Sequence, residues 1–312
     1  MSRNGRRKNR LSGRFIGLLA IVGIALAAIF IMPRVLGLDE DADTPPLQTN
    51  HSGVGEGALS ITGNHVTMAY TFAHPTATLG WHNLRDPHGL VNLITYNPRN
   101  GVLEVFTDQP AAFVVEDGDG GVLLIHITSL RQMYERIVII DPGHGGADVG
   151  AIVAGAYESH IVLDISLYLY ELFAESDSGI KAFMTRHGDD WVELSDRAAI
   201  ANNLGDLFVS IHTNTYSDPA VAGTETLYNT PQSLFLAQTV QRHLVQELGT
   251  RDRGTIHRTD LYVLNTTRIP AVFAEIDFKT NPTGFVNLTS YAYQQRVAYA
   301  LYNAIVEMFE GW

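Results

Sequence analysis

The sequence predicts an α/β protein whose C-terminal part is a three-layer αβα domain with a largely parallel sheet. After residue 136, short apolar runs typical of buried strands alternate with segments whose apolar residues recur at helical spacing. A histidine or a glutamate follows closely on three of these runs, as expected where strand ends carry a site in an open α/β sheet. Before this domain we expect a small all-β domain and an N-terminal transmembrane helix.

The first strand of the predicted sheet is the apolar run from Ile137 to Ile140. It leads directly into Asp-Pro-Gly-His-Gly-Gly at 141–146, so His144 stands on a glycine-rich turn at a strand end. Small residues around it allow a ligand or a metal to approach the backbone closely. Taken alone, the motif is also compatible with a tight turn that happens to hold a histidine.

The next element is a helix that begins at Glu158. A first-turn glutamate is usually a solvated group that favours the helix N-terminus. This one lies on the same face as the apolar stripe, so its side chain is directed toward the sheet. The stripe consists of Ile161, Val162, Ile165, Leu169, Leu172 and Phe173.

Two later strands also end at polar side chains. The run 207–211 is followed by His212, and the run 271–274 is followed by Glu275. A catalytic zinc site commonly takes three ligands from histidine and carboxylate and leaves one position for water. The two histidines and the first glutamate fit that set, which leaves Glu275 free to serve as a general base.

From about Arg136 to Trp312 the sequence resembles the zinc-dependent N-acetylmuramoyl-L-alanine amidases, a family of bacterial cell-wall hydrolases. The resemblance lies in the order and the spacing of several motifs. They are Asp-Pro-Gly-His-Gly-Gly-Ala-Asp-Val-Gly-Ala at 141–151, the Glu158 helix, Thr185-Arg186, Asp189 or Asp190, Arg197 with Ala201-Asn202, Ser210 to Asn214, Gly223 to Thr226, and Glu275 to Pro282.

This resemblance implies that residues 131–312 form a zinc amidase domain. It implies one zinc ion per chain, bound by His144, Glu158 and His212, and a catalytic role for Glu275. The expected reaction is hydrolysis of the amide bond between N-acetylmuramic acid and L-alanine in peptidoglycan.

Two further residues of the matching motifs, Arg186 and Asn214, are expected to orient the substrate or to support the ligands. Two other functions stay open. One is a zinc peptidase that cuts within the stem peptide, because the same water-activating chemistry serves both reactions. The other is a non-catalytic wall-binding or regulatory protein that retains the fold.

The N-terminus predicts a membrane anchor. A tail at 1–14 with six arginines and lysines precedes an uncharged run at 15–32, whose 18 residues are near the lower end of the length that spans a bilayer. Because basic residues favour the cytoplasmic side, we expect a single-pass protein of the cell membrane with its N-terminus inside and its catalytic domain outside the cytoplasm. If the segment is instead a cleaved signal peptide, the protein is secreted.

Two pieces separate the anchor from the catalytic domain. Residues 33–57 are predicted to be a linker, rich in acidic residues and then in Pro, Gly, Ser and Thr. Residues 58–130 are predicted to be a small β domain that targets the wall or acts as a spacer or lid. Large apolar residues alternate with polar or small ones between 66 and 72. Further strands are expected at 90–96, 101–106, 111–116 and 122–128.

Composition excludes several classes of function. The chain has 312 residues and no cysteine, so neither disulfides nor thiolate metal ligands are available. It has 21 Lys and Arg against 33 Asp and Glu, and without the six basic residues of the tail the balance is 15 against 33, or −18. Such an acidic exterior argues against nucleic acid as a partner. The expected partners are peptidoglycan and, through the anchor, the membrane.

Overall fold

The structure is a computed structural model that describes residues 58–62, 65–73, 91–97, 102–107, 111–118 and 122–311. Within these ranges, no helix is both long enough and apolar enough to cross a membrane. The expected tail at 1–14, membrane span at 15–32 and linker at 33–57 lie outside the described residues. The chain divides into two compact units, and the main boundary between them lies between Ser129 and Leu130.

The first unit contains only strands among its described residues. Four of them form a sheet in the order β1-β2-β4-β3, and the other two, β5 and β6, pair antiparallel. The strands are β1 (Ala58–Thr62), β2 (His65–Ala73), β3 (Val91–Asn97), β4 (Val102–Thr107), β5 (Ala111–Gly118) and β6 (Val122–Ser129). The strands expected from the alternating pattern are therefore confirmed to within two residues at either end, while the role of this region stays a prediction.

The second unit is built on a six-stranded sheet with the order β10-β7-β11-β14-β12-β13. All neighbouring pairs are parallel except β12 and β14, which confirms a largely parallel sheet. The strands are β7 (Arg136–Pro142), β10 (Ile180–Met184), β11 (Leu207–Asn214), β12 (Thr224–Tyr228), β13 (Asp252–His257) and β14 (Ala271–Phe278).

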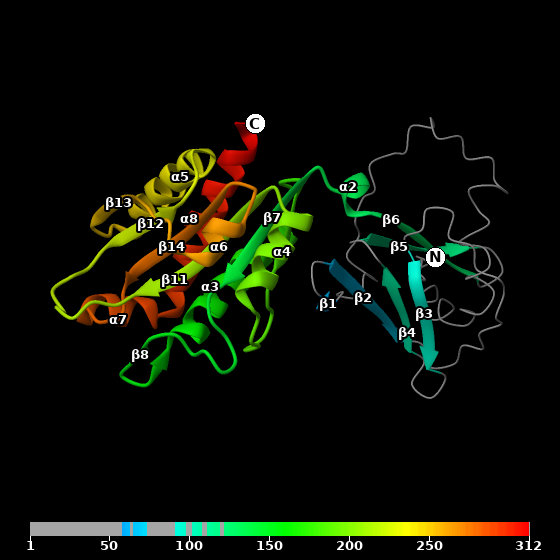
Figure 1. The fold of residues 1–312 in the computed structure, drawn as a ribbon, viewed down its shortest axis with the longest axis horizontal. Helices are drawn as coiled ribbons and strands as arrows, with labels where there is room; N and C mark the ends of the chain where they lie inside the picture. The colour runs from blue at the N-terminus through cyan, green and yellow to red at the C-terminus, as the bar shows by residue number, and fades with distance from the viewer. Residues whose placement is uncertain are drawn as a thin grey trace, which may run out of the picture. The chain divides into compact units, whose positions relative to one another are not determined.

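Helices cover both faces of this sheet (Figure 1). On one face α3 (Glu158–Glu175), α5 (Pro231–Leu248) and α8 (Tyr291–Glu310) pack together, and their apolar stripes form the main core with every second residue of the strands. The opposite face carries α4 (Leu194–Leu204) and α6 (Tyr262–Thr266). Ile137 to Ile140 are fully buried because β7 is covered on both faces. The three-layer prediction is confirmed.

Some elements differ from the sequence prediction. A hairpin of β8 (Ile152–Val153) and β9 (Ala156–Tyr157) precedes α3, and β13 and α6 are additional. These elements are short or half-exposed and have no long apolar run or stripe to reveal them. The expected end of a strand at Glu275 is also wrong, because β14 continues to Phe278 through its pairing with β11 and β12. The remaining short helices are α2 (Leu130–Met133) and α7 (Pro282–Leu288).

Candidate metal centre

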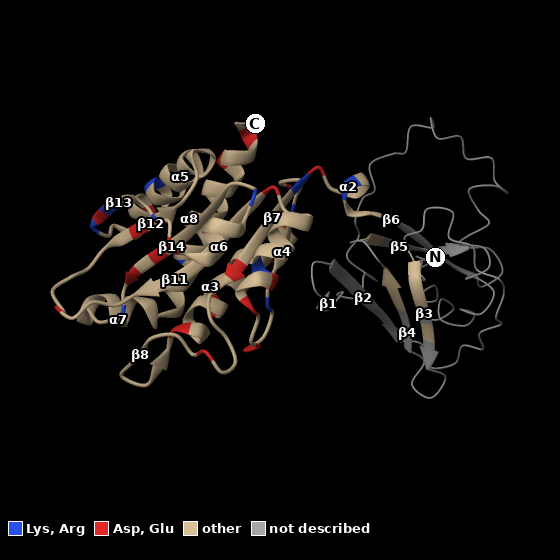
Figure 2. Cartoon of the chain, in the orientation of Figure 1, with Lys and Arg blue, Asp and Glu red and all other residues tan. Residues whose placement is uncertain are grey.

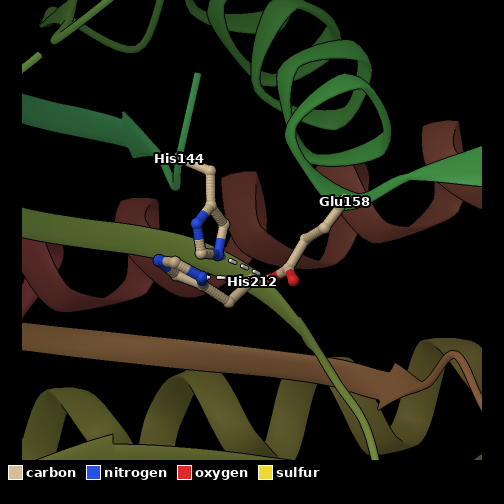
Figure 3. Close-up of side chains that lie close together, drawn as sticks. All are labelled: His144, Glu158 and His212. Atoms are coloured by element: carbon tan, nitrogen blue, oxygen red, sulfur yellow. Dashed lines mark hydrogen bonds and ion pairs between the residues drawn. The ribbon is translucent and has the colours of Figure 1, made fainter. Parts of the chain in front are cut away.

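The side chains of His144, Glu158 and His212 converge at the carboxyl ends of β7 and β11 (Figure 3). One potential ligand atom from each lies within 4.8 Å of the others. Glu158 Oε1 lies 3.3 Å from His144 Nε2 and 3.2 Å from His212 Nδ1. The structure therefore brings together the three residues predicted to bind zinc.

The geometry of this cluster fits a zinc ion. Zinc bonds to nitrogen and oxygen at about 2.0–2.1 Å, so two ligands of a tetrahedral site are about 3.4 Å apart. Both separations measured from Glu158 Oε1 are close to that value. Two imidazoles and one carboxylate are also a donor set typical of catalytic zinc, with one position left open.

The Glu158 carboxylate is held by the backbone on both of its oxygens. Oε1 accepts a hydrogen bond of 3.0 Å from the Thr213 amide, and Oε2 accepts one of 3.0 Å from the Ala151 amide. Burial raises the pKa of Glu158, but the interactions with His144 and His212 outweigh it and hold this pKa well below its ordinary value. The Glu158 side chain is thus charged and held in a fixed orientation toward the two histidines.

Asp148 orients the His144 ring. Its Oδ2 lies 2.8 Å from Nδ1 of His144, so Nε2 is the nitrogen that faces Glu158. A carboxylate on the far nitrogen of a metal-binding histidine fixes the tautomer and the ring orientation. The sequence reasoning missed this residue, although an acid four positions after a histidine in a glycine-rich turn was a usable signal. His144 itself has a left-handed backbone, with φ of 60°.

The His212 ring is enclosed by its neighbours. It stacks on Phe273 with ring centroids 3.8 Å apart and planes 12° from parallel. On the backbone of the turn, a Cβ added to Gly143 would lie only 2.1 Å from Cε1 of this ring. Gly143 is therefore required by the close approach of His212.

Glu275 occupies the neighbouring strand. The register of β11 and β14 places it opposite His212, and that of β12 and β14 places it opposite Glu225. Its Oε2 is enclosed and has no hydrogen-bond partner among the described residues. Burial, followed by the negative charges of Glu158 and Glu225, raises the pKa of Glu275 to about 8. Such a carboxyl can take up or release a proton near neutral pH.

Arg186 supports the candidate centre through hydrogen bonds to the backbone of the turn that leads to His144. This buried guanidinium donates to the carbonyl oxygens of Pro142, Gly143 and Ser159. Arg186 therefore links the turn on which His144 stands to the start of α3. Asn214, the other residue expected to orient the substrate or support the ligands, donates a hydrogen bond of 2.9 Å to Glu225 Oε1.

A buried ion pair anchors the same turn from the other side. Arg197 Nη1 lies 2.7 Å from Asp141 Oδ1, and Arg197 also donates to the carbonyl oxygens of Pro142 and His144. Asp141 in turn accepts hydrogen bonds from Thr185 and Ser210. Both charged residues belong to the motifs noted in the sequence, but their pairing was not predicted.

Known proteins share this domain. A family model described as N-acetylmuramoyl-L-alanine amidase matches residues 138–307. The uncharacterized protein YqiI of Bacillus subtilis (strain 168) is 38% identical over 180 residues, which are 56% of this chain and 85% of that protein. The N-acetylmuramoyl-L-alanine amidase AmiA of Salmonella typhimurium (strain LT2) is 31% identical over 223 residues, 56% of this chain and 76% of that protein.

A solved structure agrees with these sequence matches. The catalytic domain of CwlV, an N-acetylmuramoyl-L-alanine amidase from Bacillus (Paenibacillus) polymyxa, superposes with a TM-score of 0.54 at 30% identity. The superposition covers 56% of this chain and 98% of that domain. The matched part of the chain includes all four residues of the candidate centre.

Proposed function

The chain belongs to the family of N-acetylmuramoyl-L-alanine amidases, and from this we propose that it is a zinc-dependent enzyme whose ion is held by His144, Glu158 and His212. Its reaction is hydrolysis of the amide bond between N-acetylmuramic acid and L-alanine in peptidoglycan. The observation that carries the zinc proposal is the convergence of two imidazoles on one backbone-held carboxylate at separations that fit the ion.

Glu275 is proposed as the proton carrier of the reaction. When bound, zinc supplies a Lewis acid and a nucleophile at neutral pH. Glu275 stands beside His212 in the sheet, with an enclosed Oε2 and a pKa raised to about 8 by burial and by the charges of Glu158 and Glu225. We assign it the uptake of the proton that the attacking water loses as it adds to the amide carbon, and the delivery of that proton to the departing amine as the C–N bond breaks.

The substitution Glu275→Gln tests this assignment. It keeps the size of the side chain and removes the titrating group, so we expect zinc to stay bound while hydrolysis falls by a factor of about 10² to 10⁴. Glu310→Gln, at an exposed position near the C-terminus, is the matched control. The readouts are zinc content by elemental analysis and new L-alanine amino termini in digested peptidoglycan. Full hydrolysis by the zinc-loaded Glu275→Gln enzyme would refute the assignment.

We further propose that the enzyme works outside the cytoplasm, tethered to the cell membrane by residues 15–32. The support is the basic tail followed by 18 uncharged residues, and the linker composition of 33–57. Residues 58–130 are proposed to target the wall or to act as a spacer. Protease added to intact protoplasts should remove the catalytic domain; protection of that domain until the membrane is lysed would contradict this location.

A further inference from the structure

A row of polar side chains crosses the sheet beside the proposed zinc centre. His212 on β11 is opposite Glu275 on β14, and Glu275 is opposite Glu225 on β12. On the edge strand β13, Arg253 Nε donates a hydrogen bond of 2.7 Å to Glu225 Oε2. Residues directly opposite each other on neighbouring strands share one face of the sheet. The row thus leads from the reacting centre to a guanidinium on the edge strand.

Glu225 fixes the position of that guanidinium. Its Oε2 accepts from Arg253 and its Oε1 accepts from Asn214, so both oxygens are already used. The guanidinium carbon also lies 4.8 Å from the centre of the Phe278 ring. An ion pair and an aromatic ring together hold Arg253, so little side-chain freedom remains to be lost on binding a ligand.

Most of the hydrogen-bonding capacity of Arg253 is unused. An arginine has five N–H donors, and of these only Nε has a partner within the part of the chain that the structure describes. The side chain is 28% exposed, so an acceptor can reach it from solvent. Arg258, which follows β13, differs because its Nε and Nη2 both already bind Asp260.

We propose that Arg253 binds a carboxylate of the peptidoglycan stem peptide and so recognises an acidic second residue, the one that follows L-alanine. The two Nη groups form the planar fork that matches a carboxylate. Figure 2 shows both basic and acidic positions at β13, in a chain whose net charge is −12. This proposal rests on the proposed function, because the scissile amide must lie beside Glu275.

The spacing of the strands agrees with this substrate. Neighbouring strands are about 4.8 Å apart, so β13 lies about 10 Å from β14. An extended peptide advances about 3.5 Å per residue, so a carboxylate on the second stem residue is about 7 Å from the scissile bond. The Arg253 side chain extends from β13 toward Glu225 on the intervening strand and covers the remaining distance.

Two forms of peptidoglycan that differ in one group test the proposal. In one, the α-carboxylate of the second stem residue is free; in the other, it is an amide. With the full chain, we expect kcat/KM for release of L-alanine amino termini to be about tenfold to a hundredfold higher on the free carboxylate, mainly through KM. Arg253→Gln should bring the ratio of kcat/KM on the free carboxylate to kcat/KM on the amide to about one. Arg253→Lys should restore part of the preference for the free carboxylate.

Arg268→Gln is the matched control, because it removes the same charge from an exposed position before β14, at the other end of the strand from the centre. Zinc content and the thermal unfolding temperature show whether Arg253→Gln is folded. The inference is overturned if the wild-type enzyme does not prefer the free carboxylate, or if a folded Arg253→Gln enzyme still prefers it. Either result leaves the amidase function intact. Failure of the wild type to release L-alanine termini from either substrate overturns the proposed function, and this inference with it.

Discussion

We predict that Gly143→Ala, which adds a single methyl group, disables the metal centre. The added Cβ would lie 2.1 Å from Cε1, 2.2 Å from Nε2 and 2.6 Å from Nδ1 of the His212 ring. Ordinary van der Waals contact begins near 3.4 Å, so the ring or the turn must shift by about 1.3 Å. Because the ring stacks on Phe273 at 3.8 Å, any shift also disturbs that packing.

The size of this shift sets the expected loss. Distances in a metal site hold to within about 0.2 Å, and a misplacement of about 1 Å in a catalytic site can cost about a hundredfold in rate. We therefore expect kcat/KM to fall by about a hundredfold or more, equivalent to about 2.7 kcal/mol of transition-state stabilisation. Zinc should also be lost to a chelator at lower chelator concentration than in the wild type.

Elemental analysis after dialysis against graded chelator, together with initial rates on peptidoglycan, measures both effects. Gly311→Ala is the control, because a Cβ there meets its nearest atoms at 3.6 and 3.8 Å, which is ordinary contact. If Gly143→Ala retains zinc and hydrolyses peptidoglycan within about twofold of the wild type, the geometry given for His212 is wrong.

Three further changes have defined outcomes. Asp141→Asn leaves the buried Arg197 without a counter-ion and should lower the free energy of unfolding by about 3–5 kcal/mol in urea titrations; a loss below 1 kcal/mol would contradict this. Burial raises the pKa of Asp141, but Arg197 and the hydroxyl donors outweigh it, so the pKa of Asp141 is lower in the folded chain than in the unfolded one. The stabilisation that the ionised Asp141 provides is therefore fully present above its unfolded pKa of about 4, and it is lost as the pH falls through its lower folded pKa. Asp148→Asn removes the carboxylate that orients the His144 ring and should weaken zinc affinity about tenfold to a hundredfold in chelator competition. An unchanged zinc affinity would contradict this role of Asp148. Glu225→Gln removes one of the charges that raise the pKa of Glu275, so the acidic limb of the pH–rate profile should move to lower pH; a limb that stays or moves upward would refute the proton-carrier role.

The sequence was sufficient to select the three candidate ligands that the structure brings together, because each lies next to a strong local pattern. The buried run at 137–140, the helical stripe after Glu158 and the run at 207–211 are continuous apolar segments, and all three form as expected. Parallel strands present their carboxyl ends at one edge of the sheet, and because β7 and β11 are neighbours in it, His144 and His212 lie near each other.

The neighbours of these ligands depend on features that a local pattern does not contain. Asp148 contacts a histidine whose backbone is left-handed, a conformation that the sequence pattern does not indicate. The position of Glu225 opposite Glu275 depends on β12 pairing antiparallel with β14, a strand that comes later in the chain. Arg253 lies on an edge strand that is half-exposed and includes Gly254, so no apolar alternation marks it. Strand order and register, rather than residue type, therefore determine which residues lie on this side of the candidate metal centre.

The most direct test of the central claim is to count L-alanine amino termini released from peptidoglycan by the full chain, first stripped of metal and then reloaded with zinc. We predict one zinc ion per chain after reloading, no new L-alanine termini without metal, and recovery of release in proportion to the zinc bound. Release by the stripped chain at the rate of the reloaded one, or a stoichiometrically loaded chain that releases none, would contradict it.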